Sequence, residues 1–128
     1  MQMGKWTPEP ENFPNQFQKE LVNKKVAIFA SSAAQAFIEY EKKAEEIENN
    51  RKYLEGKPAK YNLQPISMVI FGGVWDFNKM NVIFRKTQAS FKPKIEAAGF
   101  KEIQLGLHDT RDWDAIRTWA KELAAKVA

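Results

Sequence analysis

Two short apolar runs are the clearest strand signals in this chain. One covers Lys24 to Ala30 and the other Ile66 to Phe71, and a helical pattern separates them. Runs of this length joined by a helix are typical of parallel strands in an open α/β sheet. Residues 101–107 alternate apolar and polar side chains, as a half-buried strand does. We therefore expect parallel strands near residues 24–30, 66–72 and 101–107.

Helical periodicity fills most of the chain around these strands. Apolar residues recur every four positions from Phe13 to Leu21, and Pro14 is expected to delay this helix or divide it in two. After the first strand, the periodicity predicts one long helix over residues 33–54. The sequence Gly56-Lys57-Pro58 is expected to end it.

The carboxyl-terminal half contains two more helical segments. Residues 78–100 carry apolar side chains at helical spacing, and Gly99 is expected to stop that segment. Asp112 is placed to cap the last helix, whose apolar stripe begins at Trp113. We expect Trp113, with Trp119 near it, to anchor this helix to the sheet, because a buried tryptophan removes a large apolar area from water.

Composition limits the class of protein. A chain of 128 residues with 44% hydrophobic and 28% charged residues matches a single globular domain, here residues 1–128. The absence of cysteine excludes disulfides and fits a reducing compartment. No apolar run approaches the ~20 residues of a membrane span, and the first residues lack the apolar core of a signal peptide. We expect a cytoplasmic protein without a transmembrane segment.

The formal net charge of +4 raises the possibility of a nucleic-acid partner. In the long helix, however, lysines such as Lys42 and Lys43 are interleaved with glutamates from Glu39 to Glu48. Mixed charges of this kind are typical of a solvated helix face rather than of a stripe that follows phosphates. We therefore expect no nucleic-acid partner.

The turn after the second strand is the most informative stretch for function. Phe71 is followed by Gly72, Gly73 and the aromatic-Asp-aromatic sequence that begins at Trp75. Ligands of open α/β sheets bind outside the carboxyl ends of the strands, so this turn could form the rim of a cofactor crevice. Equally, it could be a tight turn that leads into the next segment.

Residue types for other chemistry are sparse. His108, Asp109 and Asp112 are possible metal ligands, but a single histidine with loosely spaced carboxylates is a weak signal, and Asp112 already serves as a helix cap. No serine lies in a nucleophile elbow. We expect neither catalytic side chains nor a metal site, so any catalysis would come from a cofactor.

The chain resembles the flavodoxin-like flavoproteins, in particular the branch that includes the flavodoxin-type protoporphyrinogen oxidases. The resemblance covers nearly the whole chain but only the carboxyl-terminal half of the family's fold. It rests on four segments: Met3-Gly4-Lys5-Trp6, Lys24 to Ser31, Phe71 to Phe77, and Thr110 to Ile116.

The resemblance implies an α/β, three-layer fold with a parallel sheet and FMN at its carboxyl edge. This chain would be an N-terminally truncated version with about three strands and three to four helices. It would lack the first strands and the Ser/Thr/Gly-rich loop that holds the FMN phosphate in the family.

The resemblance also implies candidate FMN contacts. Trp6 would lie beside the isoalloxazine, or else pack as an ordinary terminal residue. Ser31 and Ser32 would lie along the flavin ring, or else form an unusual phosphate loop without glycine. The cofactor-binding candidates are Trp6, Ser31, Ser32, Gly72, Gly73 and Trp75.

The implied function is FMN-dependent electron transfer or another oxidoreductase activity, carried by this chain or by a larger protein of which it is a fragment. The alternative is a non-catalytic interaction module that has lost FMN. If strands are missing, the strand at residues 24–30 has an open edge, which favours association. We expect a homo-oligomer, most simply a homodimer, or a complex with a chain that supplies the missing half.

The segment from residue 78 to 100 resembles an insertion that divides the last strand in this branch. Its apolar residues could form an exposed ledge for a hydrophobic partner, or could simply be core. They are Met80, Val82, Ile83, Phe84 and Phe91.

Overall fold

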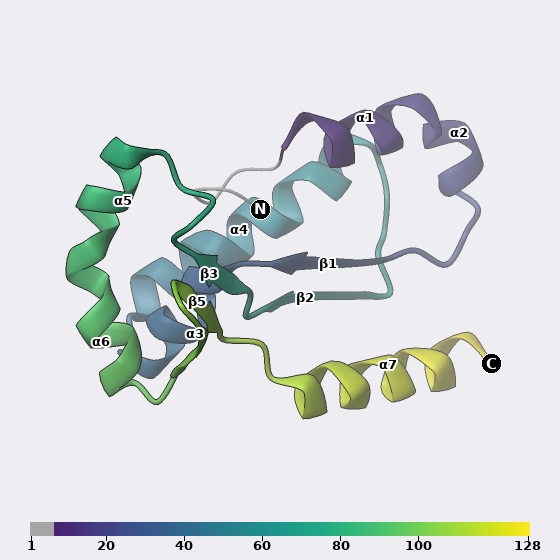
Figure 1. Ribbon diagram of the computed structural model, residues 1–128. Helices are drawn as coiled ribbons and strands as arrows, with labels where there is room; N and C mark the ends of the chain where they lie inside the picture. The colour runs from purple at the N-terminus through teal and green to yellow at the C-terminus, as the bar shows by residue number, and fades with distance from the viewer. Residues whose placement is uncertain (1–6) are drawn as a thin grey trace.

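A computed structural model of the chain describes residues 7–128, which form a mixed α/β fold with two small sheets (Figure 1). Strands β1 (Ala27–Ser31) and β2 (Ser67–Phe71) pair in parallel, with Phe29 opposite Val69. This pairing confirms two of the expected parallel strands, whose apolar runs supply side chains to both faces.

The second sheet is antiparallel and continues from the end of β2. It consists of β3 (Val74–Asp76), β4 (Glu102–Gln104) and β5 (Leu107–Asp109), in the order β3-β5-β4. The expected parallel strand over residues 101–107 is therefore wrong. Gly106, at a φ of +77°, turns the chain back within that segment, so β4 and β5 form a hairpin instead.

Seven α-helices and one 3₁₀ segment surround the sheets within residues 7–128. They are α1 (Pro8–Gln16), α2 (Gln18–Leu21), α3 (Ala33–Tyr40), α4 (Ala44–Lys60), α5 (Val82–Gln88), η1 (Ala89–Phe91), α6 (Lys92–Ala97) and α7 (Trp113–Val127). The first helical segment is divided into α1 and α2, as expected, but the division falls at Phe17, and Pro14 lies inside α1. None of these helices is long and apolar enough to cross a membrane.

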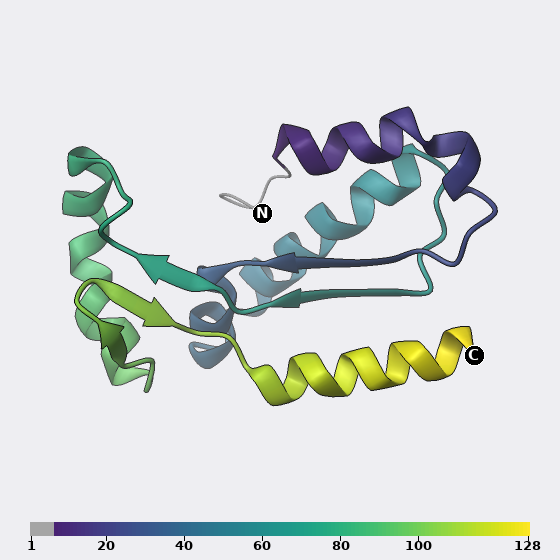
Figure 2. The same cartoon turned by 45° about the vertical axis from the view of Figure 1, so that its right-hand side comes forward.

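Helices α4 and α7 lie on opposite sides of the β1–β2 pair (Figure 2). Strand alternation sends Met68 and Ile70 toward α4, while Phe29 and Phe71 face α7. Within the described residues, β1 and β2 each have one neighbouring strand, so each has one open edge.

The expected long helix over residues 33–54 is in fact two helices. Lys42 adopts a left-handed φ of +54° and separates α3 from α4. Helix α4 then continues through Gly56 and Pro58 to Lys60, so the expected stop is also wrong. Pro58 is tolerated there because it is buried with Leu54, and burial of apolar side chains offsets the lost backbone hydrogen bond.

The buried core lies mainly between the sheets and helices α3, α4 and α6. Its apolar members are Phe37, Ile38, Leu54, Tyr61, Leu63, Phe77 and Ile95. On α5, by contrast, Val82 and Ile83 are 65% and 79% exposed, and Phe84 is also exposed. Phe91 is partly buried and packs edge-on against Phe37. Of the residues proposed for an apolar ledge, those on α5 thus lie on the surface.

Helix α7 is held by Trp119 rather than by Trp113. The indole N–H of Trp119 donates to Ser67 Oγ at 2.8 Å, and its ring contacts Phe29 and Phe71 edge-on, with centroids 6.1 and 5.6 Å apart. Trp113 is 47% exposed and stacks on the Arg111 guanidinium. The expectation that Trp113 anchors the helix is therefore wrong, since Trp113 lies at the first turn, where it packs mainly on Arg111.

Candidate functional site

The carboxyl ends of β1 and β2 meet at a polar junction, where the fold collects most of the candidate cofactor residues. Ser31 Oγ donates to the carbonyl of Gly72 at 3.0 Å, and the N–H of Ser32 donates to the carbonyl of Phe71 at 2.9 Å. Trp75 reaches the same place, because its indole N–H donates to the carbonyl of Ala33 at 3.0 Å. Five of the six candidates thus lie together, and Trp6 lies outside the described residues.

Thr110 is the junction residue that the sequence analysis missed. Its side chain is buried, and its hydroxyl donates to the carbonyl of Gly73 at 2.9 Å while accepting from the N–H of Gly73 at 3.0 Å. The N–H of Thr110 also donates to the carbonyl of Gly73, at 2.8 Å. A threonine after a short strand carries no local signal for such a role, since the contact spans 37 residues.

Both glycines of the turn are explained by close packing of the backbone. A Cβ at Gly72 would overlap the carbonyl oxygen of Thr110, and a Cβ at Gly73 would lie 2.7 Å from the backbone nitrogen of Ala33. Real Cβ atoms essentially never approach another heavy atom so closely. Glycine is therefore required at both positions so that the backbone segments can pack this closely, which is what the tight-turn interpretation proposes.

An aromatic groove of about 360 Å³ opens beside this junction, between the sheet and α7. Four aromatic side chains contribute to its wall, together with Ser31, Gly72 and Arg111; the aromatics are Phe29, Phe71, Trp113 and Trp119. We call this cavity the aromatic groove. A flat apolar ligand would find ring faces and edges there, with few polar partners.

The charge at the mouth of the aromatic groove is already paired. Arg111 donates to both carboxylate oxygens of Asp109, at 2.8 and 2.6 Å, and its guanidinium lies 4.8 Å from the centre of the Trp113 ring. The Arg111 guanidinium holds the pKa of the Asp109 carboxyl below its usual range. The pair orients Arg111 over Trp113 and leaves little net positive charge for an anion.

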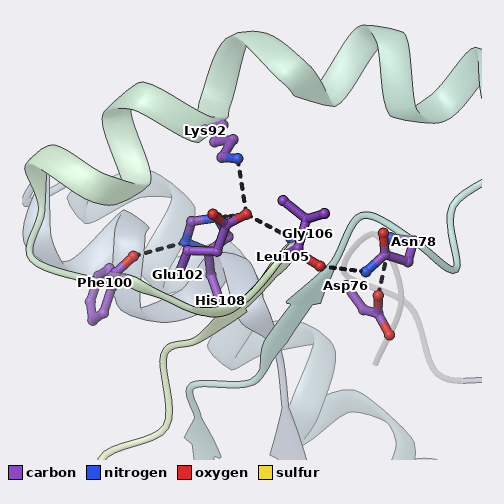
Figure 3. A network of polar contacts seen from close by, with 8 residues as sticks. All are labelled: Asp76, Asn78, Lys92, Phe100, Glu102, Leu105, Gly106 and His108. Carbon is purple, nitrogen blue, oxygen red and sulfur yellow. Dashed lines mark hydrogen bonds and ion pairs between the residues drawn. The ribbon is translucent and has the colours of Figure 1, made fainter.

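A second polar cluster lies at the β4–β5 hairpin (Figure 3). Glu102 Oε1 accepts from Lys92 Nζ at 2.9 Å and from the N–H of Gly106 at 2.6 Å. The Lys92 ammonium, followed by the Gly106 N–H, lowers the pKa of Glu102. This carboxylate therefore ties α6 to the hairpin turn.

His108 lies fully buried under this cluster. Its Nδ1 is 2.9 Å from the carbonyl of Phe100, and its Nε2 is 4.0 Å from Glu102 Oε1 and has no hydrogen-bond partner among the described residues. The ring also meets Phe77 edge-on. Because a carbonyl oxygen can only accept, Nδ1 is the nitrogen that donates to Phe100.

The potential metal ligands of the sequence are separated by these contacts. Asp112 caps α7 by accepting from the N–H groups of Asp114 and Ala115, at 3.0 and 2.9 Å, as expected. Asp109 pairs with Arg111, and His108 faces Phe100. Residues 7–128 contain no group of three or more histidine or carboxylate side chains placed to share a metal ion.

Comparison of the chain with known proteins identified no relative. No family model matches the chain, and neither a curated protein nor a solved structure matches it.

Proposed function

We propose that this chain forms the carboxyl-terminal part of a three-layer, flavodoxin-like protein that uses FMN for electron transfer or another redox reaction. The observation that carries the proposal is the aromatic groove beside Ser31 and Gly72, at the carboxyl ends of two parallel strands. Ligands of open α/β sheets bind at this edge. The placement of α4 and α7 on opposite sides of the pair also supports a layered arrangement (Figure 2).

The flavin ring is the part of FMN that the described residues fit. A groove of about 360 Å³ lies within the ~300–1,000 Å³ typical of small-molecule sites, and its walls are aromatic. Trp113 is 47% exposed at its mouth; Arg111 lies over its ring, and the exposed remainder of the ring is available to stack on a flat ligand. When bound, FMN would supply the electron chemistry, and the protein would supply orientation and exclusion of water.

The described residues do not fit the phosphate of FMN. Ser31 is engaged with Gly72, and Gly73 packs against the backbone at the start of α3. The described residues after β1 contain no glycine until Gly56 that would let the backbone wrap an anion. The proposal therefore includes a phosphate loop supplied from outside the described residues, by another part of the protein or by a partner chain, and residues 7–128 alone should hold flavins weakly.

A second candidate is an interaction module that binds no flavin. It is favoured by the internal pairing of the junction, since Ser31, Thr110 and the Trp75 indole all donate to main-chain carbonyls. In that case the junction serves to hold the two sheets together.

Flavin titration of the isolated chain separates these functions. We expect riboflavin and FMN to bind with similar, weak affinity, because only the ring is recognised, with Trp113→Ala weakening both. Phe84→Ala, on the distant helix α5, is the matched control and should change neither. Measured by flavin fluorescence, absence of saturable binding of either flavin would reject the redox function and leave the interaction module. Much tighter binding of FMN than of riboflavin would instead place a phosphate site within this chain.

A further inference from the structure

His108 is the only histidine of the chain, and its side chain is fully buried in the antiparallel sheet. Strand pairing places it opposite Trp75 of β3 and Glu102 of β4. The Phe77 ring meets it edge-on, with the ring centroids 5.8 Å apart. The imidazole is thus fixed by its neighbours and has no surface exposed to water.

The two ring nitrogens of His108 differ in their surroundings. Nδ1 donates to the carbonyl of Phe100 at 2.9 Å, whereas Nε2 has no hydrogen-bond partner among the described residues. Glu102 Oε1 lies 4.0 Å from Nε2, which is too far for a hydrogen bond. A buried polar atom without a partner costs free energy, so a second state in which Nε2 is paired has a physical reason to form.

A proton on Nε2 would make Glu102 the partner of the ring. In the neutral ring the proton lies on Nδ1, so Nε2 and the Glu102 oxygen are both acceptors and cannot bond. In the charged ring Nε2 is a donor, and a positive charge held out of water requires a negative partner. Among the described residues, Glu102 is the only carboxylate within 4.0 Å of the nitrogens of His108.

The other charged groups around this sheet are engaged elsewhere or exposed. On β3, Asp76 pairs with Lys79 at 3.6 Å. On β5 itself, Asp109 pairs with Arg111 at 2.6 Å. Lys101, which precedes β4, is exposed. The remaining cation is on α6, and it faces the His108 ring through Glu102.

Glu102 is placed to move between this cation, Lys92, and His108. Its side chain is 26% exposed, and Oε1 accepts from Lys92 Nζ at 2.9 Å and from the N–H of Gly106 at 2.6 Å (Figure 3). A displacement of about 1 Å would bring the same oxygen within hydrogen-bond distance of Nε2. Because the Lys92 ammonium and the Gly106 N–H lower the pKa of Glu102, this carboxylate stays ionised in mild acid, where histidines take up protons.

We propose that His108 and Glu102 form a pH-sensitive switch: in mild acid Nε2 of His108 takes a proton from solvent, and Glu102 turns from Lys92 toward the charged ring. The carboxylate that ties α6 to the β4–β5 hairpin is then shared with the core of the sheet. Helix α6 is therefore held less firmly in acid than at neutral pH. The charge on one buried ring is the local event, and the attachment of α6 is the element that responds. This inference does not depend on flavin binding.

An NMR titration tests the switch, because a single histidine gives unambiguous ring nitrogen signals. Between about pH 8 and about pH 5, the ring of the folded chain should pass from the Nδ1-protonated form to the doubly protonated form. Glu102→Gln keeps an oxygen that can accept from Lys92 but removes the negative charge. It should lower the proton affinity of His108 by about tenfold or more. Glu96→Gln is the matched control, because Glu96 is an exposed carboxylate of α6 that acts on Lys92, and it should leave that affinity unchanged.

The response of α6 is read from Ile95, whose side chain is fully buried on that helix. In the wild-type chain its methyl NMR signals should shift with the same midpoint as the His108 ring. His108→Asn keeps an N–H donor for Phe100 but has no group that titrates, so the Ile95 signals should stay constant over this pH range. Protonation of Glu102 itself falls at lower pH, because its pKa is lowered, so the two events are separated.

Three outcomes would overturn the proposal. The first is a ring that takes its second proton only when circular dichroism shows that the chain unfolds. The second is equal proton affinity of His108 in the wild type, Glu102→Gln and Glu96→Gln. The third is an Ile95 signal that does not follow the ring, since His108 and Glu102 would then serve packing alone. If Glu102→Gln does not fold, the wild-type titration and His108→Asn still decide.

Discussion

Replacement of Trp119 by alanine tests how helix α7 is attached to the sheet. The side chain is partly buried, contacts two aromatic rings and donates to Ser67 Oγ at 2.8 Å. A fully buried tryptophan costs about 3–5 kcal/mol when truncated, and a hydrogen bond contributes about 0.5–1.5 kcal/mol. Since Trp119 is not fully buried, we expect Trp119→Ala to reduce the free energy of unfolding by about 3 kcal/mol.

Trp113→Ala is the matched control on the same helix. Trp113 is 47% exposed and loses mainly its stacking on Arg111, which is worth about 0.5–1 kcal/mol at an exposed site. Urea unfolding followed by circular dichroism gives both free energies. At about 4 °C per kcal/mol, the melting temperature should fall by about 12 °C for Trp119→Ala and by a few degrees for Trp113→Ala.

The opposite ranking would refute this reasoning. If Trp113→Ala were as costly as Trp119→Ala, the first turn of α7 would be packed against something other than Arg111. Trp119→Phe should lie between wild type and Trp119→Ala, because it keeps the ring contacts and loses the hydrogen bond to Ser67.

Two further predictions concern backbone packing and pH. Gly73→Ala should destabilise the fold, because its Cβ would lie 2.7 Å from the backbone nitrogen of Ala33. Gly56→Ala, whose Cβ would meet open space on helix α4, should instead raise the free energy of unfolding by about 0.5–1 kcal/mol, as measured by urea unfolding. Equal effects of the two substitutions would contradict the packing of the junction. The hydrogen bond from Lys57 lowers the pKa of Glu11, so this contact stabilises the fold above the usual glutamate pKa and is lost as pH falls through the lowered value. The difference in urea midpoint between wild type and Glu11→Gln should therefore be largest near pH 7 and vanish in acid, and a difference independent of pH would exclude the ion pair as its source.

Local sequence was sufficient for the elements whose signals lie within a few residues. The apolar runs became β1 and β2, and Asp112 caps α7 through its own N-terminal turn. Gly99, at a φ of +91°, follows the end of α6 as expected. Strand alternation, helix caps and left-handed glycines depend on short-range sterics and hydrogen bonds, so a linear pattern records them.

The candidate site was determined only in part by sequence. The meeting of Ser31 with Gly72 follows from the rule that parallel strands present their carboxyl ends at one edge. That Thr110 would occupy the turn beside Gly73, or that the Trp75 indole would bond Ala33, does not follow, because these contacts join segments 37 and 42 residues apart.

The remaining features were decided by tertiary packing. Helix α4 continues through Pro58 because that residue is buried, and the segment after Lys101 turns back at Gly106 because β3 offers it an antiparallel partner. Likewise, the helical pattern of α7 does not say which tryptophan meets the sheet, since the choice depends on where β1 and β2 end. In each case the deciding energy is burial against a surface that the sequence forms elsewhere, which local periodicity does not encode.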